Sequence, residues 1–233
     1  VRAVAVVPEG EEDKYINMTK TQTSIEIKSE DDSGDTLLFK GIVTDIEVKA
    51  VRGVYYVIID GVSSTFNLDL KSKRRSFQNK DMTYTSLIKE VIKDYSGADY
   101  IDIAAKSNKI EKFIIQYDET DWQFLKRMAS HFNTGLIADA SSDKPKFWFG
   151  IAQGGQKGNI EQFNYSVSKR IADFRVSSEN YIEGIEDKDF TYFKVETDAI
   201  LDIGDSISFM SKNLSVFQST AKLKDGILIH EYL

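Results

Sequence analysis

The chain has 233 residues, of which 41% are hydrophobic and 29% charged, which is ordinary for a soluble globular protein with one large or two small domains. The net charge of −7 argues against a surface built to bind nucleic acid phosphates, and the absence of cysteine excludes disulfides and thiolate metal sites. No apolar run approaches the roughly 20 residues that span a bilayer, so we expect no membrane insertion of this segment.

The first part of the sequence alternates polar and apolar residues as β-strands do. One long segment contains Gly41, where we expect the strand to bend sharply, and Arg52-Gly53 forms a tight turn. Two long strands joined by a tight turn predict an antiparallel meander or a small barrel. The expected strands are Thr23–Lys28, Leu37–Lys49 and Val54–Val62, with a solvated turn at Glu30–Asp35.

The middle of the sequence predicts two short helices. The first is capped by Thr83 or Thr85 and ends at Gly97. The second begins at Thr120, which forms a capping box with Gln123. Apolar residues at helical spacing define the buried faces, which are Leu87, Ile88, Val91, Ile92 and Tyr95 in the first helix and Trp122, Leu125, Met128, Ala129 and Phe132 in the second. A strand is expected at Lys112–Tyr117 and a hairpin at 136–150.

Glycines are frequent from Gly150 to Gly158, which predicts a linker or a mobile loop. The sequence after it is again typical of strands, with a hairpin turn at Asp225-Gly226. We therefore expect a β-rich region over 1–76, an α/β middle domain over 77–150 and a second β-rich region over 151–233. Because the sequence starts at Val1 and ends in a strand-like segment, we expect a piece of a longer protein. The expected strands of the last region are Tyr165–Val176, Tyr192–Thr197, Ser206–Met210 and Ser215–Lys222.

The titratable residues give no pattern typical of a catalytic, cofactor or metal site. His131 and His230 lie far apart and lack metal-ligand spacing, and an imidazolium at His131 suits the negative end of the second helix. Asp118, Glu119 and Asp121 cluster where that helix begins, and acidic side chains stabilise helix N-termini. We interpret all of these residues as structural, and expect neither a metal nor a cofactor.

One basic run stands out in this acidic chain, formed by Lys71, Lys73, Arg74 and Arg75. Such a run can contact nucleic acid or an acidic partner. The acidic balance of the chain and the lack of an aromatic ladder beside the run argue against nucleic acid. We interpret it as a solvated or partner-facing segment.

Two segments carry a recognisable pattern. Arg75-Ser76-Phe77-Gln78 leads into the first helix, and residues 116–135 read QYDETDWQFLKRMASHFNTG. The second segment fits the pattern QY-x-E-T-D-W-x-F-L-x-R, and together the two resemble the late control D and VgrG family of phage tails and contractile injection systems. The residues that carry the resemblance, in structural rather than catalytic roles, are Arg75, Phe77, Gln78, Asp121, Trp122, Phe124, Leu125 and Gly135.

The resemblance implies a β-rich α+β fold, with two tail-tube-like antiparallel β-barrels and a small α/β insert between them. It implies a non-enzymatic baseplate hub protein, a homotrimer whose six barrels adapt the hexameric tail tube to the trimeric central spike. The implied partners are the tail tube protein, the central spike protein and other baseplate proteins, without specific nucleic acid binding. The implied location is the tail baseplate of a virion or phage-like particle, such as an R-type bacteriocin, assembled in the bacterial cytoplasm.

Two other functions remain open at this stage. A tail-associated cell-wall hydrolase could use Asp118, Glu119 or Asp121 as acid and base. A carbohydrate-binding or adhesin module could use exposed aromatic side chains. Turnover of peptidoglycan would favour the first of these, and glycan binding the second.

Overall fold

The computed structural model describes residues 1–31, 34–152, 154–161, 165–179, 185–195, 197, 199, 201, 203–210 and 219–222. The chain divides into two compact units, Val1–Gly150 and Ile151–Leu233, and each is described by itself. The division falls at the start of the glycine-rich segment that the sequence predicts as a linker. The further boundary expected at residue 76 remains a prediction.

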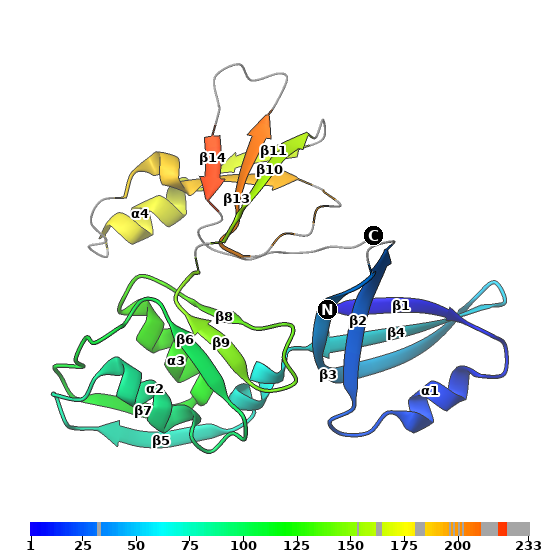
Figure 1. The fold of residues 1–233 in the computed structure, drawn as a ribbon, viewed down its shortest axis with the longest axis horizontal. Helices are drawn as coiled ribbons and strands as arrows, with labels where there is room; N and C mark the ends of the chain where they lie inside the picture. The colour runs from blue at the N-terminus through cyan, green and yellow to red at the C-terminus, as the bar shows by residue number, and fades with distance from the viewer. Residues whose placement is uncertain are drawn as a thin grey trace. The chain divides into compact units, whose positions relative to one another are not determined.

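The first unit begins with a four-stranded antiparallel sheet in the order β1-β4-β3-β2 (Figure 1). The tight turn predicted at Arg52-Gly53 is confirmed, since both residues have positive φ, 53° and 80°, and join β3 to β4. A short helix, α1, packs against β3 and β4, and neither it nor β1 was predicted from the sequence. The bounds are β1 Arg2–Val7, α1 Glu12–Met18, β2 Ser24–Asp31, β3 Gly34–Val51 and β4 Val54–Val62.

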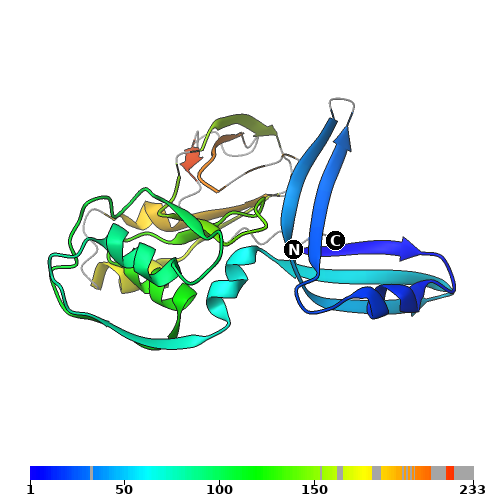
Figure 2. The same cartoon turned by 60° about the horizontal axis from the view of Figure 1, so that its bottom comes forward.

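The long strand β3 bends, as predicted, close to Gly41. Its first half pairs with β2 and its second half with β4, and a bulge between Val43 and Asp45 interrupts the register. Figure 2 shows the β2–β3 hairpin turning away from β1 and β4. A Cβ atom on Gly41 would lie 2.2 Å from the carbonyl oxygen of Val62, so the close approach of the two strands requires glycine here.

The described part of this sheet is open, because β1 and β2 each pair with only one neighbouring strand. It also has little core of its own: the described apolar residues of β1–β4 that are buried are Val7 and Val57. The β-rich prediction is therefore confirmed for this region, and the closure of the sheet into a barrel remains a prediction.

The rest of the first unit is an α/β arrangement that holds the main hydrophobic core. The hairpin predicted at 136–150 is confirmed as an antiparallel pair, β8 with β9, and β6 pairs in parallel with β9. The strands β5 and β7 form a separate antiparallel pair. The bounds are a 3-10 helix at Ser64–Asp69, β5 Ser72–Phe77, α2 Tyr84–Ile92, β6 Asp99–Asp102, β7 Ile114–Thr120, α3 Asp121–Ser130, β8 Leu136–Ala138 and β9 Lys146–Phe149.

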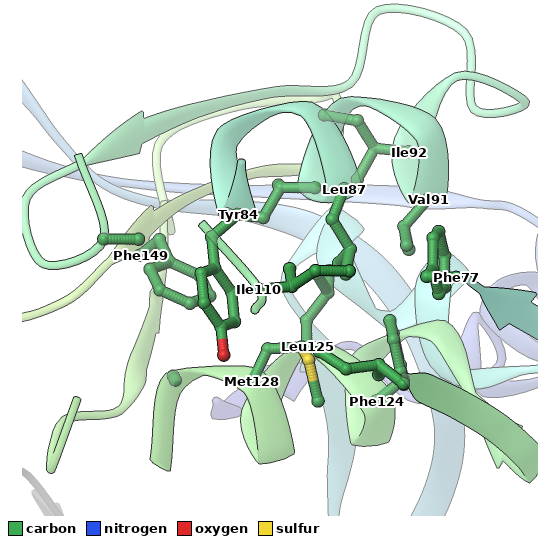
Figure 3. Close-up of a cluster of buried hydrophobic side chains, with 14 of the residues drawn as sticks. Phe77, Tyr84, Leu87, Val91, Ile92, Ile110, Phe124, Leu125, Met128 and Phe149 are labelled. Atoms are coloured by element: carbon green, nitrogen blue, oxygen red, sulfur yellow. The ribbon is translucent and has the colours of Figure 1, made fainter. Parts of the chain in front are cut away.

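The core lies between α2 and α3, as Figure 3 shows. Of the two caps considered for α2, the structure selects Thr83, whose side-chain oxygen accepts a hydrogen bond from the backbone N–H of Ser86 at 3.1 Å. The helix ends at Ile92, so the expected end at Gly97 is wrong. Gly97 instead lies in the following turn, where its φ of 72° suits a residue without a side chain.

The helix α3 has the capping box that the sequence predicts, between Thr120 and Gln123. Leu125, Met128 and Ala129 are buried as predicted, whereas Trp122 and Phe132 pack against the core and stay partly exposed. Two buried residues of this helix, Asp121 and Phe124, fall outside the predicted apolar face.

The second unit contains a mixed sheet, β10-β13-β14, and an antiparallel pair, β11-β12. The pairing of β10 with β13 is parallel, which corrects the expectation of purely antiparallel strands. A parallel pair needs a long crossover, and here β11, α4 and β12 lie between the two strands in sequence. The bounds are β10 Gln156–Glu161, β11 Tyr165–Lys169, α4 Ile171–Glu179, a 3-10 helix at Asp187–Phe190, β12 Thr191–Val195, β13 Ser206–Met210 and β14 Ser219–Lys222.

One predicted strand of this unit is wrong in its second half. The segment Tyr165–Val176 is a strand only to Lys169, and α4 follows. The β-branched residues Ile171 and Val176 favoured a strand here, but β propensity is a weak guide out of context, and the rings of Phe174 in α4 and Phe190 lie edge-on with centroids 5.7 Å apart. The part of the strand expected at 215–218 and the turn at Asp225-Gly226 lie outside the described residues.

Candidate functional site

A buried carboxylate, that of Asp121, is the centre of the most elaborate polar arrangement in the α/β region. Lys73 Nζ lies 2.7 Å from Oδ2, and Arg75 Nη1 lies 3.0 Å from Oδ1. The hydroxyl of Tyr95 donates to Oδ2 at 2.6 Å, and the amide of Gln116 donates to Oδ1 at 3.0 Å. We call these five residues the Asp121 cluster. It joins β5, β7, the turn after α2 and the first residue of α3.

The strand period explains how β5 contributes to the cluster. Alternate residues of a strand point to opposite faces, so Lys73, Arg75 and Phe77 share the face that packs on the helices, and Arg74 points outward. In the facing strand β7, Gln116 occupies an inward position and is completely buried. The cluster therefore holds β5, β7 and α3 together through one shared carboxylate.

The buried carboxylate of Asp121 is more than compensated, because two cations face it, and one of them, Lys73, also lies 3.7 Å from the exposed carboxylate of Asp94. Burial opposes ionisation of Asp121, but hydrogen bonds from Lys73, Tyr95 and Gln116 and the charge of Arg75 outweigh burial, and the pKa of the carboxyl lies below its ordinary value. Burial and the hydrogen bond to Asp121 raise the pKa of Tyr95, which stays neutral at pH 7. An ionised aspartate paired with cations is the form in which a buried charge is tolerated.

The other two acidic residues of this segment also have dedicated cationic partners. Arg74 makes a two-point contact with Asp118 at 2.7 and 2.9 Å, and Arg127 makes one with Glu119 at 2.8 and 2.7 Å. The hydrogen bond from Arg74 lowers the pKa of Asp118. A glycosidase acid needs a raised pKa, so the pairing of these carboxylates gives the hydrolase hypothesis no support.

The basic run is divided between two environments, and only part of it is the solvated segment that the sequence suggests. The side chains of Lys73 and Arg75 are only 20% and 19% exposed and belong to the Asp121 cluster, and Arg74 pairs with Asp118. Only Lys71 is exposed and without an ion pair to any acidic residue within the described ranges. The solvated interpretation holds for Lys71 and Arg74 and is wrong for Lys73 and Arg75, because consecutive residues of a strand have different environments.

Four of the sequence-predicted site residues come together in two pairs. Arg75 lies against Asp121 in the cluster. Phe77 stacks on Phe124 with ring centroids 5.6 Å apart and an angle of 13° between the planes. Both pairs connect β5 to α3, although β5 and α3 are far apart in the sequence.

The remaining predicted residues are dispersed. Leu125 is fully buried in the core, and Trp122 meets the ring of Phe147 edge-on at 5.6 Å. Gln78 is exposed, with its amide 3.4 Å from the hydroxyl of Ser76. The carbonyl of Gly135 accepts a hydrogen bond from Gly150, but a Cβ on Gly135 would meet no atom within 4 Å, and nothing in the structure explains why glycine occurs there.

Three members of the cluster were missed as site residues: Lys73, Tyr95 and Gln116. The alternation of β7 offered a signal for Gln116, because a polar residue at an inward strand position needs a buried partner. Lys73 was read with its neighbours as one basic run, and Tyr95 was assigned to the apolar face of a helix that ends before it.

The environment of His131 differs from the expectation of an imidazolium. Burial and the nearby charges of Lys112 and Arg127 lower its pKa, so the ring is neutral at pH 7. Its Nδ1 lies 2.7 Å from the hydroxyl of Tyr84. Across the part of the chain that the structure describes, no group of three or more metal-ligating side chains lies together, and no helix is long and apolar enough to cross a membrane.

One solved structure shares this fold at low sequence identity. An Escherichia coli protein, c3393, superposes with a TM-score of 0.54 at 12% identity over 83% of this chain and 56% of its own. It is described as a component of the type VI secretion system with structural similarity to the bacteriophage T4 tail proteins gp27 and gp5. This likeness shows the fold, and the chain spans little more than half the length of that protein.

Two further structures match with TM-scores of 0.46 and 14% identity. The 43 kDa tail protein of prophage MuSo2 from Shewanella oneidensis covers 62% of this chain and 50% of its own. A tail protein from Neisseria meningitidis MC58 covers 90% of this chain and 72% of its own. No curated protein matches the sequence.

The family comparison is more specific than these superpositions. The model of the phage tail baseplate hub family matches residues 6–142, which include strands β2, β3 and β4 of the four-stranded sheet, the Asp121 cluster and both helices of the core. The match covers more than half of the chain and contains the two segments on which the resemblance was recognised. The chain belongs to the phage tail baseplate hub (GPD) family.

Proposed function

We propose that this chain is a non-enzymatic structural part of a baseplate hub, in which three copies form a ring that adapts a hexameric tail tube to a trimeric central spike. Each copy supplies two tail-tube-like β-barrels, so that three copies present six similar elements to the tube. The partners are the tail tube protein, the central spike protein and other baseplate proteins. The hub belongs to a virion or phage-like particle assembled in the bacterial cytoplasm.

Membership of the baseplate hub family supports this proposal first. The division into two compact units, each with its own sheet, supports the assignment of one barrel to each unit. The α/β region between residues 64 and 149 has its own core and fits the insert between the barrels.

The observation that best supports assembly into a ring is the incomplete burial of the four-stranded sheet. Val4 and Val6 of β1 share one face and are 60% and 66% exposed, and the described strands leave the edges of β1 and β2 unpaired. A sheet with free edges and exposed apolar residues is stable in water when neighbouring chains cover it. A ring of copies supplies such cover, because each copy brings the same edges to the next.

The predicted site residues have a supporting role in this proposal. Arg75 and Asp121, together with Phe77 and Phe124, hold β5 against α3. The remaining motif residues, Gln78, Trp122, Leu125 and Gly135, are proposed as structural as well. No catalytic residue, metal or cofactor is part of the proposal.

The oligomeric state and the particle test this function. Native mass spectrometry of the purified chain over a range of concentrations should give a trimer, and electron microscopy of the particle should place three copies between tube and spike. Two results together would overturn the proposal: a chain that stays monomeric at every concentration, and particles in which no copy of the chain lies between tube and spike.

A further inference from the structure

Asp205 carries a buried acidic side chain at the turn that leads into β13. The residue is 2% exposed, and it lies between Gly204 of the turn and Ser206, the first residue of the strand. Aspartate is rarely buried without a partner, because removing a charge from water is costly. The groups that its carboxylate contacts therefore indicate what the residue does.

Those contacts lie in the glycine-rich segment that the sequence predicts as a linker. Oδ1 of Asp205 accepts a hydrogen bond from the backbone N–H of Gly155 at 3.0 Å. Oδ2 lies 3.6 Å from Nζ of Lys157. The carboxylate thus joins two parts of the second unit that are 50 positions apart in the sequence. We call residues 154–157 the glycine strap.

The backbone of the glycine strap is bonded to the same turn. The N–H of Gly154 donates to the carbonyl of Gly204, and the N–H of Ser206 donates to the carbonyl of Gly155, both at 2.9 Å. The next residue, Gln156, pairs with Ser206 in the parallel register of β10 and β13. The strap is exposed to solvent, so hydrogen bonds and an ion pair hold it rather than the burial of apolar side chains.

Two glycines are required for this close approach. A Cβ on Gly154 would lie 2.3 Å from Oδ1 of Asp205. Gly204 has a φ of 99°, and a Cβ there would lie 2.2 Å from the carbonyl oxygen of Ala152. A Cβ on Gly155, by contrast, would meet no atom within 4 Å. The glycines at 154 and 204 therefore allow contact between two backbones, which is a different use of glycine from that in a flexible linker.

The chain is also held just before the glycine strap, within the first unit. The N–H of Gly150 donates to the carbonyl of Gly135 at 3.0 Å, and the φ of Gly150 is 107°. Residues 151–153 separate this anchored glycine from Gly154. The segment expected as a linker from Gly150 to Gly158 is thus anchored at its first residue and again from Gly154 onward.

We propose that Asp205 is a latch that fixes the glycine strap to the start of β13, so that the connector between the two units ends at Gly154 and not at Gly158. The reach of a linker grows with its number of free residues, so the latch limits how far the two units can move independently. This inference goes beyond the proposed function, and it holds for any number of copies in the hub.

Amide hydrogen exchange of the unaltered chain tests the latch directly. The N–H groups of Gly154, Gly155 and Ser206 should exchange at least about tenfold more slowly than in the unfolded chain, because each donates to an acceptor across the latch. Exchange of the Gly155 amide at the rate of the unfolded chain would overturn the proposal, since a mobile linker gives that result.

Cleavage by trypsin after Lys157, identified by the mass of the fragments, tests the residues that close the latch. Asp205→Ala should raise the rate of this cleavage by about tenfold or more, because proteases cut segments that open locally. Asp205→Asn keeps an oxygen acceptor for Gly155 and should raise the rate less. Gly154→Ala should behave like Asp205→Ala, and Gly155→Ala, which adds the same methyl group in open space, is the matched control and should cleave like wild type.

Two measurements distinguish an open latch from an unfolded unit. In Asp205→Ala the amides of β11 and β12 should stay protected, because that strand pair does not include the latch. Both tryptophans lie in the first unit, and their emission should not change. Loss of protection throughout β11 and β12 would overturn the latch, because Asp205 would then be needed to fold the whole second unit. Equal cleavage rates of Gly154→Ala and Gly155→Ala would overturn it as well.

Discussion

The ammonium group of Lys73 lies 2.7 Å from a carboxylate oxygen of Asp121, and that carboxylate is completely buried. The two residues belong to different elements, β5 and α3, that follow one another only after a helix and two further strands. Together with Arg75 this contact places an ionised group inside the α/β region and fixes how the strands meet the helix. The stability of the region should therefore depend on Asp121 more than on its other acidic residues.

Asp121→Asn should destabilise the chain by about 3 kcal/mol, because it leaves Arg75 without its counter-charge and Lys73 with only the more distant carboxylate of Asp94, at 3.7 Å. Urea unfolding monitored by circular dichroism measures the loss. Asp118→Asn is the matched control, since its ion pair with Arg74 is solvent-exposed and should change the midpoint little. Equal effects of the two substitutions would contradict the central role of the Asp121 cluster.

The contribution of Asp121 to stability should depend on pH in a defined direction. Its pKa in the folded chain lies below the ordinary value of 3.8, so the unfolded chain takes up a proton at higher pH than the folded chain does. The stabilisation is therefore complete above about pH 5 and is lost as the pH falls through 3.8 towards the folded pKa. The difference in unfolding free energy between wild type and Asp121→Asn should be constant from neutral pH down to that point and then shrink. A difference that grows in acid would mean that the carboxyl is protonated in the folded chain.

Thr120→Ala should cost about 1 kcal/mol, because it removes the side-chain oxygen that accepts the hydrogen bond from the backbone N–H of Gln123. The substitution also removes the hydrogen bond that the Thr120 hydroxyl donates to the carboxylate of Asp69. Thr120→Ser keeps both interactions and should retain most of the stability. Thermal unfolding of the two variants provides the comparison, and a serine variant as unstable as the alanine variant would argue that the methyl group of Thr120 matters instead.

Two glycine substitutions should have opposite outcomes. Gly41→Ala should destabilise the four-stranded sheet strongly, because the new Cβ would lie 2.2 Å from the carbonyl oxygen of Val62. Gly135→Ala should be tolerated, since its Cβ would meet no atom within 4 Å. Amide hydrogen exchange resolves the effect by region, and faster exchange in β3 and β4 of Gly41→Ala is the expected signature. Unchanged exchange in that variant would show that the strands can separate at the bend without cost.

Histidine protonation offers a further check on the electrostatics at the end of α3. The pKa of His131 should lie below 6.5, because partial burial and two nearby cations disfavour the imidazolium. NMR titration measures it, and His131→Gln assigns the signal, since the chain has only one other histidine. A pKa above 6.5 would restore the expectation of a cation at the end of α3.

The local features of this protein were predictable because they depend on residues close together in sequence. The capping box of Thr120 and Gln123 and the turn at Arg52-Gly53 need only a few neighbouring residues. The bend at Gly41 followed from a glycine in a strand too long to stay straight. The pattern from Gln116 to Arg127 was sufficient to indicate the baseplate hub family.

Only the tertiary structure decided where the charged residues point and which strands pair. The strand period places Lys73 and Arg74 on opposite faces of β5, but only the packing of β5 on α3 decides that Lys73 joins the Asp121 cluster and Arg74 is exposed. The parallel pairs β6–β9 and β10–β13 likewise join segments that are distant in sequence. Ion pairs and strand pairing between distant segments depend on how the whole region packs, and residue patterns within a short window carry no record of that packing.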